Sequence, residues 1–541
     1  MPAPGTGPAV SFGFPPAPPR PLGPPVETTA EKRSLFDRFL DGVERAGNRL
    51  PDPVTLFLIF IAIVMAASAI AAALGASAVH PGTGERVEAL SLFSGELVQR
   101  LFVELPQTFA AFPPLGLVLA VMIGIGVADK TGLIAAALRA FIGSVPDALL
   151  TASLVFAGIM SSLAVDAGYV VVIPLGAVLF AGAGRHPLAG LAAAFAGVSA
   201  GFSANLLLTG LDPLLAGFTT PAAQLIDPTY EVAATANYYL MVALTPIFVL
   251  VGTWVTERVL EPRLGAWSPD EAGDAGAAED ETAVSPETAA VERRGLVWAG
   301  VVLAVTLVGV ALLVVPEGAP LRGPAGELDP FFRSIVAVML FAFLLPGLAF
   351  GIVTGSIRSD RDAVKMTADA MSDLGLYIVL AFVAAHFIAL FNWSNLGTIV
   401  AISGAEGLEA IGFTGTPLLI AFVVVAALVN LLVGSASAKW AILAPIFVPM
   451  LMLLGFSPEL TQGAYRLGDA FTNIVTPLMP YFPLVIVFGQ RYVPSLGIGT
   501  LIGAMLPYSI AFGVVSVVVL VAWVLLGLPL GPGAPLEYVV P

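Results

Sequence analysis

The sequence contains no cysteine and only three histidines among its 541 residues. Without cysteine the chain can form no disulfide framework, thiolate metal site or cysteine nucleophile. His80, His186 and His386 are widely separated and no HExxH segment occurs, which argues against a zinc hydrolase. The 23 Lys and Arg residues against 38 Asp and Glu give a net charge of −15, whereas nucleic-acid binding needs a basic footprint.

Charge of either sign is also scarce. Only 11% of the residues are charged and 57% are hydrophobic, whereas a soluble globular domain carries about 25% charged residues. The composition therefore predicts an all-α polytopic membrane protein. At about 20 residues for each helical crossing, the apolar stretches would hold roughly nine to eleven crossings before the loops are assigned.

Nine apolar stretches are predicted to span the bilayer: residues 53–74, 112–128, 148–183, 233–256, 295–315, 333–352, 374–391, 416–454 and 497–527. Basic residues cluster just before the first stretch, at Lys32, Arg33, Arg38, Arg45 and Arg49. By the positive-inside rule the N-terminus lies in the cytoplasm. Basic and base-poor loops then alternate if the Gly/Pro-rich segments 187–217 and 458–488 do not cross, and this places the C-terminus outside.

The chain divides into five regions by composition. Residues 266–292 hold eight acidic residues and no Lys or Arg, which is typical of a solvated linker. The leader is too rich in proline to form a packed core. We predict a disordered Pro-rich leader over 1–30, a first membrane repeat over 31–264, an acidic cytoplasmic linker over 265–294, a second membrane repeat over 295–530 and an external tail over 531–541. Between the first two spans we expect an external loop with an interfacial helix.

The two membrane regions resemble each other at a separation of 271 residues. At this offset the pairs that coincide are Pro174 with Pro445, Gly184 with Gly455, Pro187 with Pro458, and Gly197 with Gly468. Chance is the alternative, because Gly and Pro are abundant. If the match is a repeat, the two copies enter the membrane from opposite faces. Inverted repeats with broken helices are the construction of secondary transporters, with the site near mid-membrane.

The interrupted segments 187–217 and 458–488 are predicted to be re-entrant helical hairpins. Their tips would be Gly201–Asn205 and Thr472–Asn473. An interrupted helix is tolerated in the membrane only where protein or a watery cavity surrounds it, so the interruptions indicate the site. The tips offer oxygen atoms to a hard cation such as Na⁺, and helix N-termini to an anion.

Five ionisable residues fall within the predicted membrane regions, and such residues are functional candidates because their burial is costly. They are Asp166, Asp212, Lys439, Arg466 and Asp469. Arg466 and Asp469 are three apart, so on a helix they share a face and could simply neutralise each other. Alternatively Arg466 offers its donor fork to a substrate carboxylate and Asp469 orients it. Asp212 could bind a proton or cation, or could cap a helix.

Neutral residues near the second interruption have two interpretations as well. Trp440 could stack on an aromatic substrate or lie against the Lys439 ammonium, or it could be an ordinary packing residue. Asn430 and Ser435 could supply oxygens to a cation, or could join helices by hydrogen bonds. The candidate Na⁺ ligands are therefore Asn205, Asn430, Ser435, Thr472 and Asn473.

Several long motifs resemble those of one known family. They are Gly434-Ser-Ala-Ser-Ala-Lys-Trp440-Ala-Ile-Leu-Ala-Pro445, Gly-Phe-Ser-Pro458, Ala-Tyr-Arg466-Leu-Gly-Asp469, Ser203-Ala-Asn-Leu-Leu-Leu-Thr-Gly-Leu-Asp212-Pro and Asp166-Ala-Gly-Tyr. They resemble the AbgT family of p-aminobenzoyl-glutamate transporters over roughly residues 33–530. The resemblance implies a homodimer in a bacterial-type inner membrane. Each subunit would have nine spans and two re-entrant hairpins, as in the ion-transporter superfamily that includes the divalent-anion/Na⁺ symporters.

The resemblance also implies a function. The resemblance implies either an importer of p-aminobenzoyl-glutamate or an exporter of sulfonamide antimetabolites. We expect transport coupled to Na⁺ or H⁺, and no other cofactor. The residues that correspond to the family's substrate pathway are Asp212, Ser437, Trp440, Pro458, Arg466, Asp469 and Pro477. A bound cation is implied near Asn430.

Three other functions are alternatives. A secondary transporter of other carboxylates would use the same arginine. An intramembrane enzyme would use the buried aspartates, but no Gly-x-Gly-Asp motif occurs and Gly-Leu-Asp212-Pro is the nearest sequence. An anion channel would use the tips as a filter. We therefore expect a transporter and not an enzyme.

Overall fold

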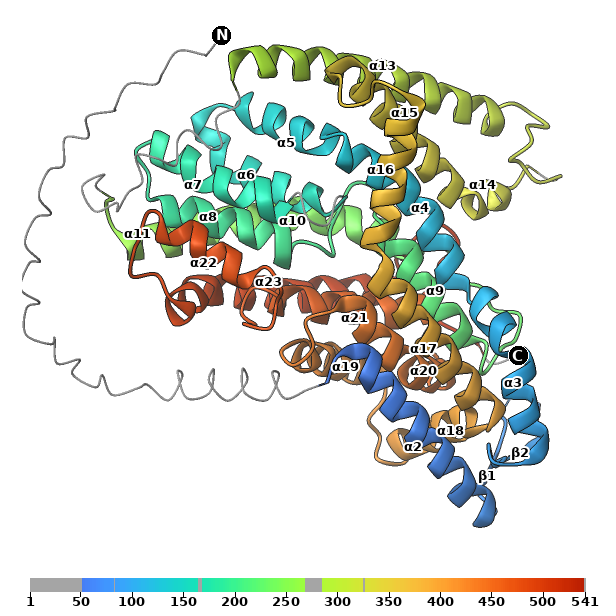
Figure 1. Ribbon diagram of the computed structural model, residues 1–541. Coiled ribbons are helices and arrows are strands. Elements are labelled where there is room, and N and C mark those ends of the chain that lie inside the picture. The colour runs from blue at the N-terminus through green and yellow to red at the C-terminus, as the bar shows by residue number, and fades with distance from the viewer. Residues whose placement is uncertain (1–50, 82, 164–167, 268–284, 325, 540–541) are drawn as a thin grey trace, which may run out of the picture.

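The computed structural model describes residues 51–81, 83–163, 168–267, 285–324 and 326–539 (Figure 1). In these ranges the regular structure is helical, apart from one antiparallel pair of short strands, β1 (Ser77–Val79) and β2 (Arg86–Glu88). The predicted leader, the N-terminal basic cluster, Asp166 and most of the acidic linker lie outside the described residues.

The helices fall into two sets in chain order. Before the linker they are α2 (Pro53–Ala73), α3 (Gly95–Ala110), α4 (Pro113–Lys130), α5 (Leu133–Gly143), α6 (Leu150–Met160), α7 (Ile173–Gly182), α8 (Pro187–Phe195), α9 (Leu211–Ala223), α10 (Tyr238–Val255) and α11 (Glu261–Leu264). After it they are α13 (Pro286–Val314), α14 (Asp329–Arg333), α15 (Ile335–Thr354), α16 (Asp360–Asp373), α17 (Gly375–Trp393), α18 (Leu396–Ala410), α19 (Gly415–Asn430), α20 (Ala436–Leu453), α21 (Pro458–Thr472), α22 (Phe482–Gln490) and α23 (Ile498–Leu525). Short 3₁₀ segments are η1 (Asp147–Leu149) and η2 (Ser161–Leu163), and π-helical turns are η3 (Gly168–Val172), η4 (Ala196–Ala200) and η5 (Thr256–Leu260).

The number of long apolar helices agrees with the number of membrane spans predicted from the sequence. Within the described ranges, eight helices are long and apolar enough to cross a membrane. The helix pair Leu133–Gly143 and Asp147–Leu163, bent by 118°, makes a ninth if it is counted as one span. The prediction of an all-α polytopic membrane fold with about nine spans is confirmed.

Two boundaries differ from the sequence prediction. The segment after α2 forms the β1–β2 hairpin before α3, whereas only a loop and a helix were expected. Helix α13 begins at Pro286 inside the predicted linker, because the Ser285 side chain caps it by accepting a hydrogen bond from the Thr288 N–H at 3.2 Å. The last nine residues of the predicted linker are therefore helical.

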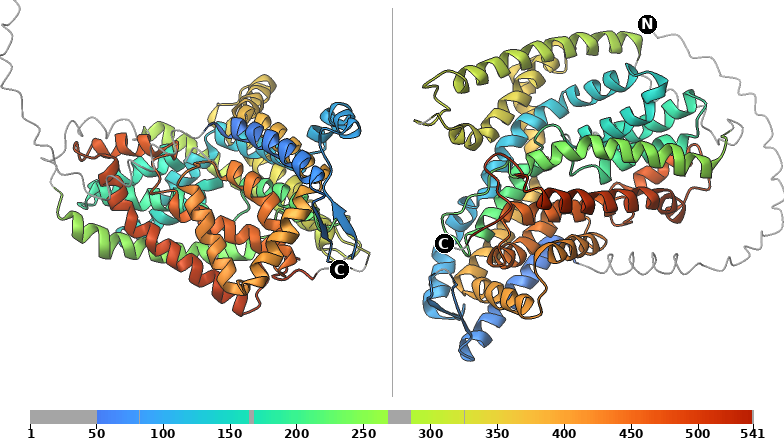
Figure 2. Two further views of the ribbon diagram at one scale, coloured as in Figure 1. Left: turned by 90° about the horizontal axis from the view of Figure 1, so that it is seen from below. Right: turned by 180° about the vertical axis from the view of Figure 1, so that it is seen from behind.

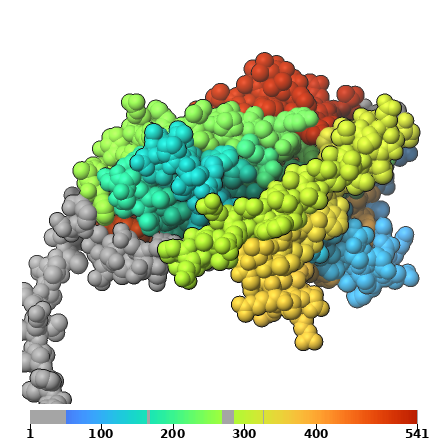
Figure 3. Space-filling model, turned by 90° about the horizontal axis from the view of Figure 1, so that it is seen from above, coloured from blue at the N-terminus to red at the C-terminus, as the bar shows by residue number. Residues whose placement is uncertain are grey.

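The helices form two groups that pack side by side. Helix α2 packs on α17, α17 on α4, and α4 on both α15 and α16, and together these helices form an arc along one side (Figure 1). In the other group, α10 and α23 lie side by side (Figure 2), and Phe248 stacks on Phe512 with ring centroids 4.6 Å apart. Helix α13 packs mainly on α15 and crosses the molecule as an exposed ridge (Figure 3). Only 6% of the apolar 18-residue stretch of this helix is buried inside the protein.

Both predicted interruptions are breaks in helical structure. The chain is irregular over residues 201–210, between η4 and α9, and over 473–481, between α21 and α22. Pro187 and Pro458, which coincide in the 271-residue overlay, each stand in the first turn of a helix. Proline is tolerated there because its missing N–H would have no partner inside the helix.

The segments on either side of each break pack on different neighbours. Helix α8 packs on α6 and α7, whereas α9 packs on α4, α20 and α21. Helix α21 packs on α19 and α23, whereas α22 packs on α7 and α8. Helices α7 and α8 approach closely because Gly176 and Gly190 have no side chains. A Cβ at either position would collide with the backbone of the other helix. The re-entrant path and the inverted orientation of the copies stay predictions.

Candidate functional site

Two buried ion pairs lie where α9, from the first half of the chain, packs against α20 and α21 from the second half. The first joins Arg466 on α21 to Asp212 on α9, with Nη1 2.5 Å from Oδ1. The two side chains are only 3% and 1% exposed. The other Asp212 oxygen accepts hydrogen bonds from the Thr209 N–H and hydroxyl, at 2.6 and 2.9 Å. Asp212 therefore holds the turn before α9 and also neutralises an arginine from the second half of the chain.

The second ion pair joins Lys439 on α20 to Asp469 on α21. The Lys439 ammonium also donates to the side-chain oxygen of Asn430 at the end of α19. The sequence hypothesis that Arg466 and Asp469 neutralise each other along one helix is therefore wrong. Each has its ionic partner on a different helix, α9 for Arg466 and α20 for Asp469.

Three polar atoms in this cluster have no hydrogen-bond partner among the described residues. They are Nε and Nη2 of Arg466 and Oδ2 of Asp469, and all are buried. Buried polar atoms in native proteins are nearly always hydrogen-bonded, so each exception calls for an explanation. Arg466 and Asp469 are three residues apart on α21, and side chains with that spacing are neighbours on a helix. The cluster thus offers two adjacent donors and one nearby acceptor to a ligand.

An aromatic pair flanks the charged residues. The Trp440 ring stacks on the Tyr465 ring with centroids 4.5 Å apart and planes 23° apart. The Tyr465 hydroxyl donates to the Ala436 carbonyl at 2.6 Å. No cation lies over the Trp440 ring within the described residues, so the alternative in which the Lys439 ammonium lies against this ring is not observed there.

A chain of neutral hydrogen bonds continues from Trp440 toward the start of α21. Trp440 Nε1 donates to the Thr219 hydroxyl at 2.9 Å, and this hydroxyl donates to Gln462 Oε1 at 2.6 Å. Gln462 Nε2 then donates to Asn237 Oδ1 at 2.8 Å, and Asn237 donates to the Glu459 carbonyl at 2.8 Å. Sequence reasoning missed Tyr465, Thr219, Gln462 and Asn237. Only Tyr465 carried a signal, because it lies next to Arg466 in the motif.

Three of the candidate Na⁺ ligands lie together at the second break. Asn430 Nδ2 donates to Thr472 Oγ1 at 2.7 Å and to Asn473 Oδ1 at 2.8 Å. The Asn430 side-chain oxygen already accepts a hydrogen bond from the Lys439 ammonium. A cation bound at this oxygen would therefore have to displace Lys439.

The other candidate ligands are elsewhere. Asn205 donates to Ser162 Oγ at 3.0 Å and accepts from the Leu207 N–H at 2.9 Å. Ser435 caps α20 and lies 3.2 Å from the Ser437 hydroxyl. In the described ranges, no group of three or more His, Cys, Asp or Glu side chains is placed to hold a metal ion.

Two other predicted substrate residues, Pro458 and Pro477, flank the charged part of α21 in the chain. Pro458 begins α21, so it stands eight residues, or about 12 Å along the helix axis, from Arg466. Pro477 lies in the irregular segment between α21 and α22. The structure therefore brings together Asp212, Arg466, Asp469 and Trp440.

Glu459 is a buried acid that the sequence did not single out. It is 4% exposed and accepts a hydrogen bond from the Tyr230 hydroxyl at 2.9 Å. It lies in the first turn of α21, which is not among the helices long enough to span a membrane. It lines a pocket of about 660 Å³ that also includes the ion pair between Arg333 and Glu231, 2.9 Å apart. Burial raises the pKa of Glu459 to about 7.

Comparison with known proteins places this geometry in a family. The model of the AbgT putative transporter family matches residues 38–538. The p-aminobenzoyl-glutamate transport protein of Escherichia coli (strain K12) is 37% identical over 494 residues, which cover 91% of this chain and 95% of that protein.

Two solved structures are similar over their full lengths. The Alcanivorax borkumensis YdaH transporter has a TM-score of 0.84 and 44% identity, covering 89% of this chain and 100% of that one. Neisseria gonorrhoeae MtrF, described as illuminating a class of antimetabolite efflux pumps, has a TM-score of 0.86 and 45% identity, covering 92% and 100%. These relatives are transporters or efflux pumps, not enzymes.

Proposed function

Because the chain belongs to the AbgT transporter family, we propose that it carries small aromatic molecules that bear an amine and an acidic group. p-Aminobenzoyl-glutamate represents this class. Sulfonamide antimetabolites, which have an arylamine and a sulfonyl group, are the second representative. The names of the E. coli relative and of MtrF support the two cases respectively.

The observation that carries the proposal is the set of unpartnered atoms on α21. Arg466 keeps Nε and Nη2 available while Nη1 is paired with Asp212. Two neighbouring guanidinium donors match the two oxygens of a carboxylate. Asp469 Oδ2 is an acceptor, and an arylamine is a donor that suits it. A ligand with both groups satisfies all three atoms.

The aromatic pair supplies the rest of the specificity. Trp440 is fully buried and its indole N–H is held by Thr219, so the ring is fixed in orientation. Stacked or edge-on contacts with such a ring add about 0.5–1.5 kcal/mol beyond buried area. An aryl group placed between Arg466 and Asp469 lies near this ring pair, because Tyr465 is adjacent to Arg466 on α21.

Transport in this proposal is driven by Na⁺ or H⁺, and the protein works as a homodimer in the inner membrane. The four charges of the two ion pairs are buried in a closed arrangement, so access to the ligand atoms requires movement. The moving part would be the group of helices that contains both breaks, and the arc of α2, α4 and α15–α17 would stay in place. Any cation that binds at Asn430 competes with Lys439 for the same oxygen.

A transporter of non-aromatic carboxylates is the second candidate, because the Arg466 donors alone would serve it. That candidate leaves Asp469 Oδ2 and the aromatic pair without a function. The two candidates differ in whether the ligand must donate a hydrogen bond.

Competition in proteoliposomes tests the proposal. Labelled p-aminobenzoyl-glutamate is taken up by purified protein, and unlabelled p-aminobenzoyl-glutamate, benzoyl-glutamate and succinate compete. Benzoyl-glutamate lacks only the amine, so losing the bond to a charged acceptor should weaken it by about tenfold or more. Equal competition by all three would favour the carboxylate transporter. Independent Na⁺ and pH gradients identify the driving ion, and flux that ignores both contradicts ion coupling.

A further inference from the structure

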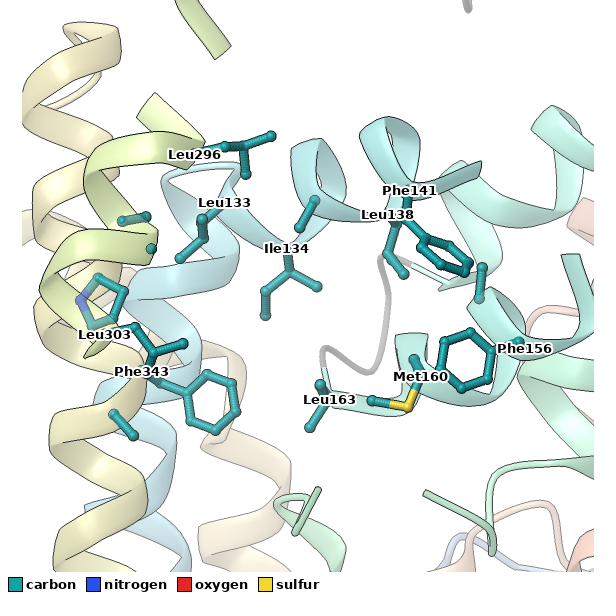
Figure 4. Close-up of a pocket in the computed structure, with 16 residues that line it drawn as sticks. Leu133, Ile134, Leu138, Phe141, Phe156, Met160, Leu163, Leu296, Leu303 and Phe343 are labelled. Carbon is teal, nitrogen blue, oxygen red and sulfur yellow. The ribbon is translucent and has the colours of Figure 1, made fainter. Parts of the chain in front are cut away.

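An apolar groove runs beneath α13, away from the charged cluster. It lies between α5 and α6 on one side and α13 and α15 on the other, and it has a volume of about 380 Å³. Figure 4 shows Leu133, Ile134 and Leu138 of α5 pointing into it, opposite Leu303 of α13 and Phe343 of α15. All 16 residues that line it are apolar. Its size is in the range of small-ligand sites, about 300–1,000 Å³.

Basic residues stand at one end of the groove. Arg293 and Arg294 are exposed and lie just before Leu296, the first α13 residue in the lining. Arg139 of α5 pairs with Glu292 at 2.7 Å, and its Nε is buried without a hydrogen-bond partner among the described residues. Arg139 and Arg293 outnumber the one carboxylate, Glu292, that is paired here, and Arg294 is the next residue along α13, so the excess charge at this end is positive.

The length of the groove corresponds to one leaflet. Arg293 and Leu303 are ten residues apart on α13, which is about 15 Å along the helix axis. The hydrocarbon core of a bilayer is about 30 Å thick. Trp298, near the basic end, is 56% exposed, as is typical of a residue at headgroup level. A molecule with its charge at the arginines and its apolar part along the groove would reach mid-membrane.

We propose that this groove is a binding site for an anionic phospholipid of the cytoplasmic leaflet. One acyl chain lies between α5, α13 and α15, and the phosphate is held by Arg293 and Arg294 with Arg139 Nε beside them. Basic pockets between membrane helices bind anionic headgroups in this way. The site is separate from the ion pairs on α21, so the proposal does not depend on which solute is transported.

Two substitutions test the two ends of the site. The double variant Arg293→Gln/Arg294→Gln removes the headgroup charges. Gly300→Leu places a side chain into the groove, and it fits because nothing lies within 4 Å of a Cβ at Gly300. The matched controls are Arg361→Gln/Lys365→Gln, which removes two exposed charges on α16, and Gly309→Leu, at a second open glycine of α13 outside the groove.

The measurement is native mass spectrometry of the full-length protein with added phosphatidylglycerol or phosphatidylcholine of equal chain length. Wild-type protein should retain phosphatidylglycerol preferentially. The arginine variant should lose this preference, on the order of tenfold in retention. Gly300→Leu should reduce retention of both lipids, and both controls should behave as wild type.

Three results would overturn the proposal. They are equal retention of the two lipids by wild-type protein, an equal loss in the α16 control, and unchanged retention in Gly300→Leu. If Gly300→Leu instead dissociates a dimer while lipid retention stays the same, the groove belongs to a second copy of the chain.

Discussion

Replacing Arg466 by lysine should separate the two tasks that the side chain performs in this structure. One nitrogen, Nη1, neutralises Asp212 at 2.5 Å, and two others have no partner among the described residues. Lysine keeps the positive charge near Asp212 but has no planar fork. The variant should therefore fold. Arg466→Ala, by contrast, would leave a buried carboxylate uncompensated, which typically costs about 3–5 kcal/mol.

The expected loss appears in substrate binding. A hydrogen bond to a charged group contributes about 1.5–3 kcal/mol, so losing one such bond raises KM by about ten- to a hundredfold. The assay is the concentration dependence of p-aminobenzoyl-glutamate uptake in proteoliposomes, with thermal stability measured on the same preparation. Because the lost contact is made to bound substrate, KM should change more than the maximal rate.

A matched control is available at Arg185. This arginine binds Glu261 with two nitrogens, at 2.8 and 2.6 Å, outside the charged cluster. Arg185→Lys removes a similar fork and should leave the KM unchanged. An Arg466→Lys protein with wild-type KM and stability would refute the assignment of Nε and Nη2 to the substrate.

Three further outcomes follow from the geometry. Lys439→Met should destabilise the protein by about 3–5 kcal/mol because Asp469 loses its ion pair, and adding Asp469→Asn should restore part of this, as thermal unfolding will show. Trp440→Phe keeps an aromatic ring but loses the 2.9 Å bond to Thr219, so a loss of about 1 kcal/mol in stability is expected. The pKa of Glu459 is raised from 4.5 to about 7 in the folded protein, so its contribution to stability is complete below pH 4.5 and falls by about 3 kcal/mol as the pH rises to 7. Glu459→Gln should remove this pH dependence from thermal unfolding, and an unchanged dependence would exclude Glu459 as its source.

The sequence located the breaks in the helices because their causes are local. Glycine and proline interrupt helical hydrogen bonding wherever they cluster, and the irregular segments 201–210 and 473–481 lie inside the predicted intervals. The buried charges were equally visible, since an ionisable residue in an apolar stretch stands out whatever its partner is.

The partners of those charges could not be predicted from local spacing. Arg466 and Asp469 have the spacing of a helical ion pair, yet each pairs with a residue on another helix. The tertiary fold decided the pairing, because α9 and α20 both pack on α21. The Trp440–Tyr465 stack depends on the same packing of α20 on α21.

The sequence also gave weak signals for two local features. The strands of the β1–β2 hairpin are three residues each and are joined without a two-residue Asn-Gly or Asp-Gly turn. The start of α13 depends on a single capping serine, Ser285, in a stretch whose acidic composition resembled a linker. The average composition of the linker therefore did not reveal that α13 begins inside it, at Pro286.

In the proposed function, Arg466 and Asp469 hold opposite ends of one ligand beside α9 and α20. Determining the structure of the protein with bound p-aminobenzoyl-glutamate tests this most directly. We expect ligand density beside Trp440, with a ligand oxygen on Arg466 Nε or Nη2 and the amine on Asp469 Oδ2. Density in the groove under α13, with the atoms of Arg466 and Asp469 still unpartnered, would contradict it.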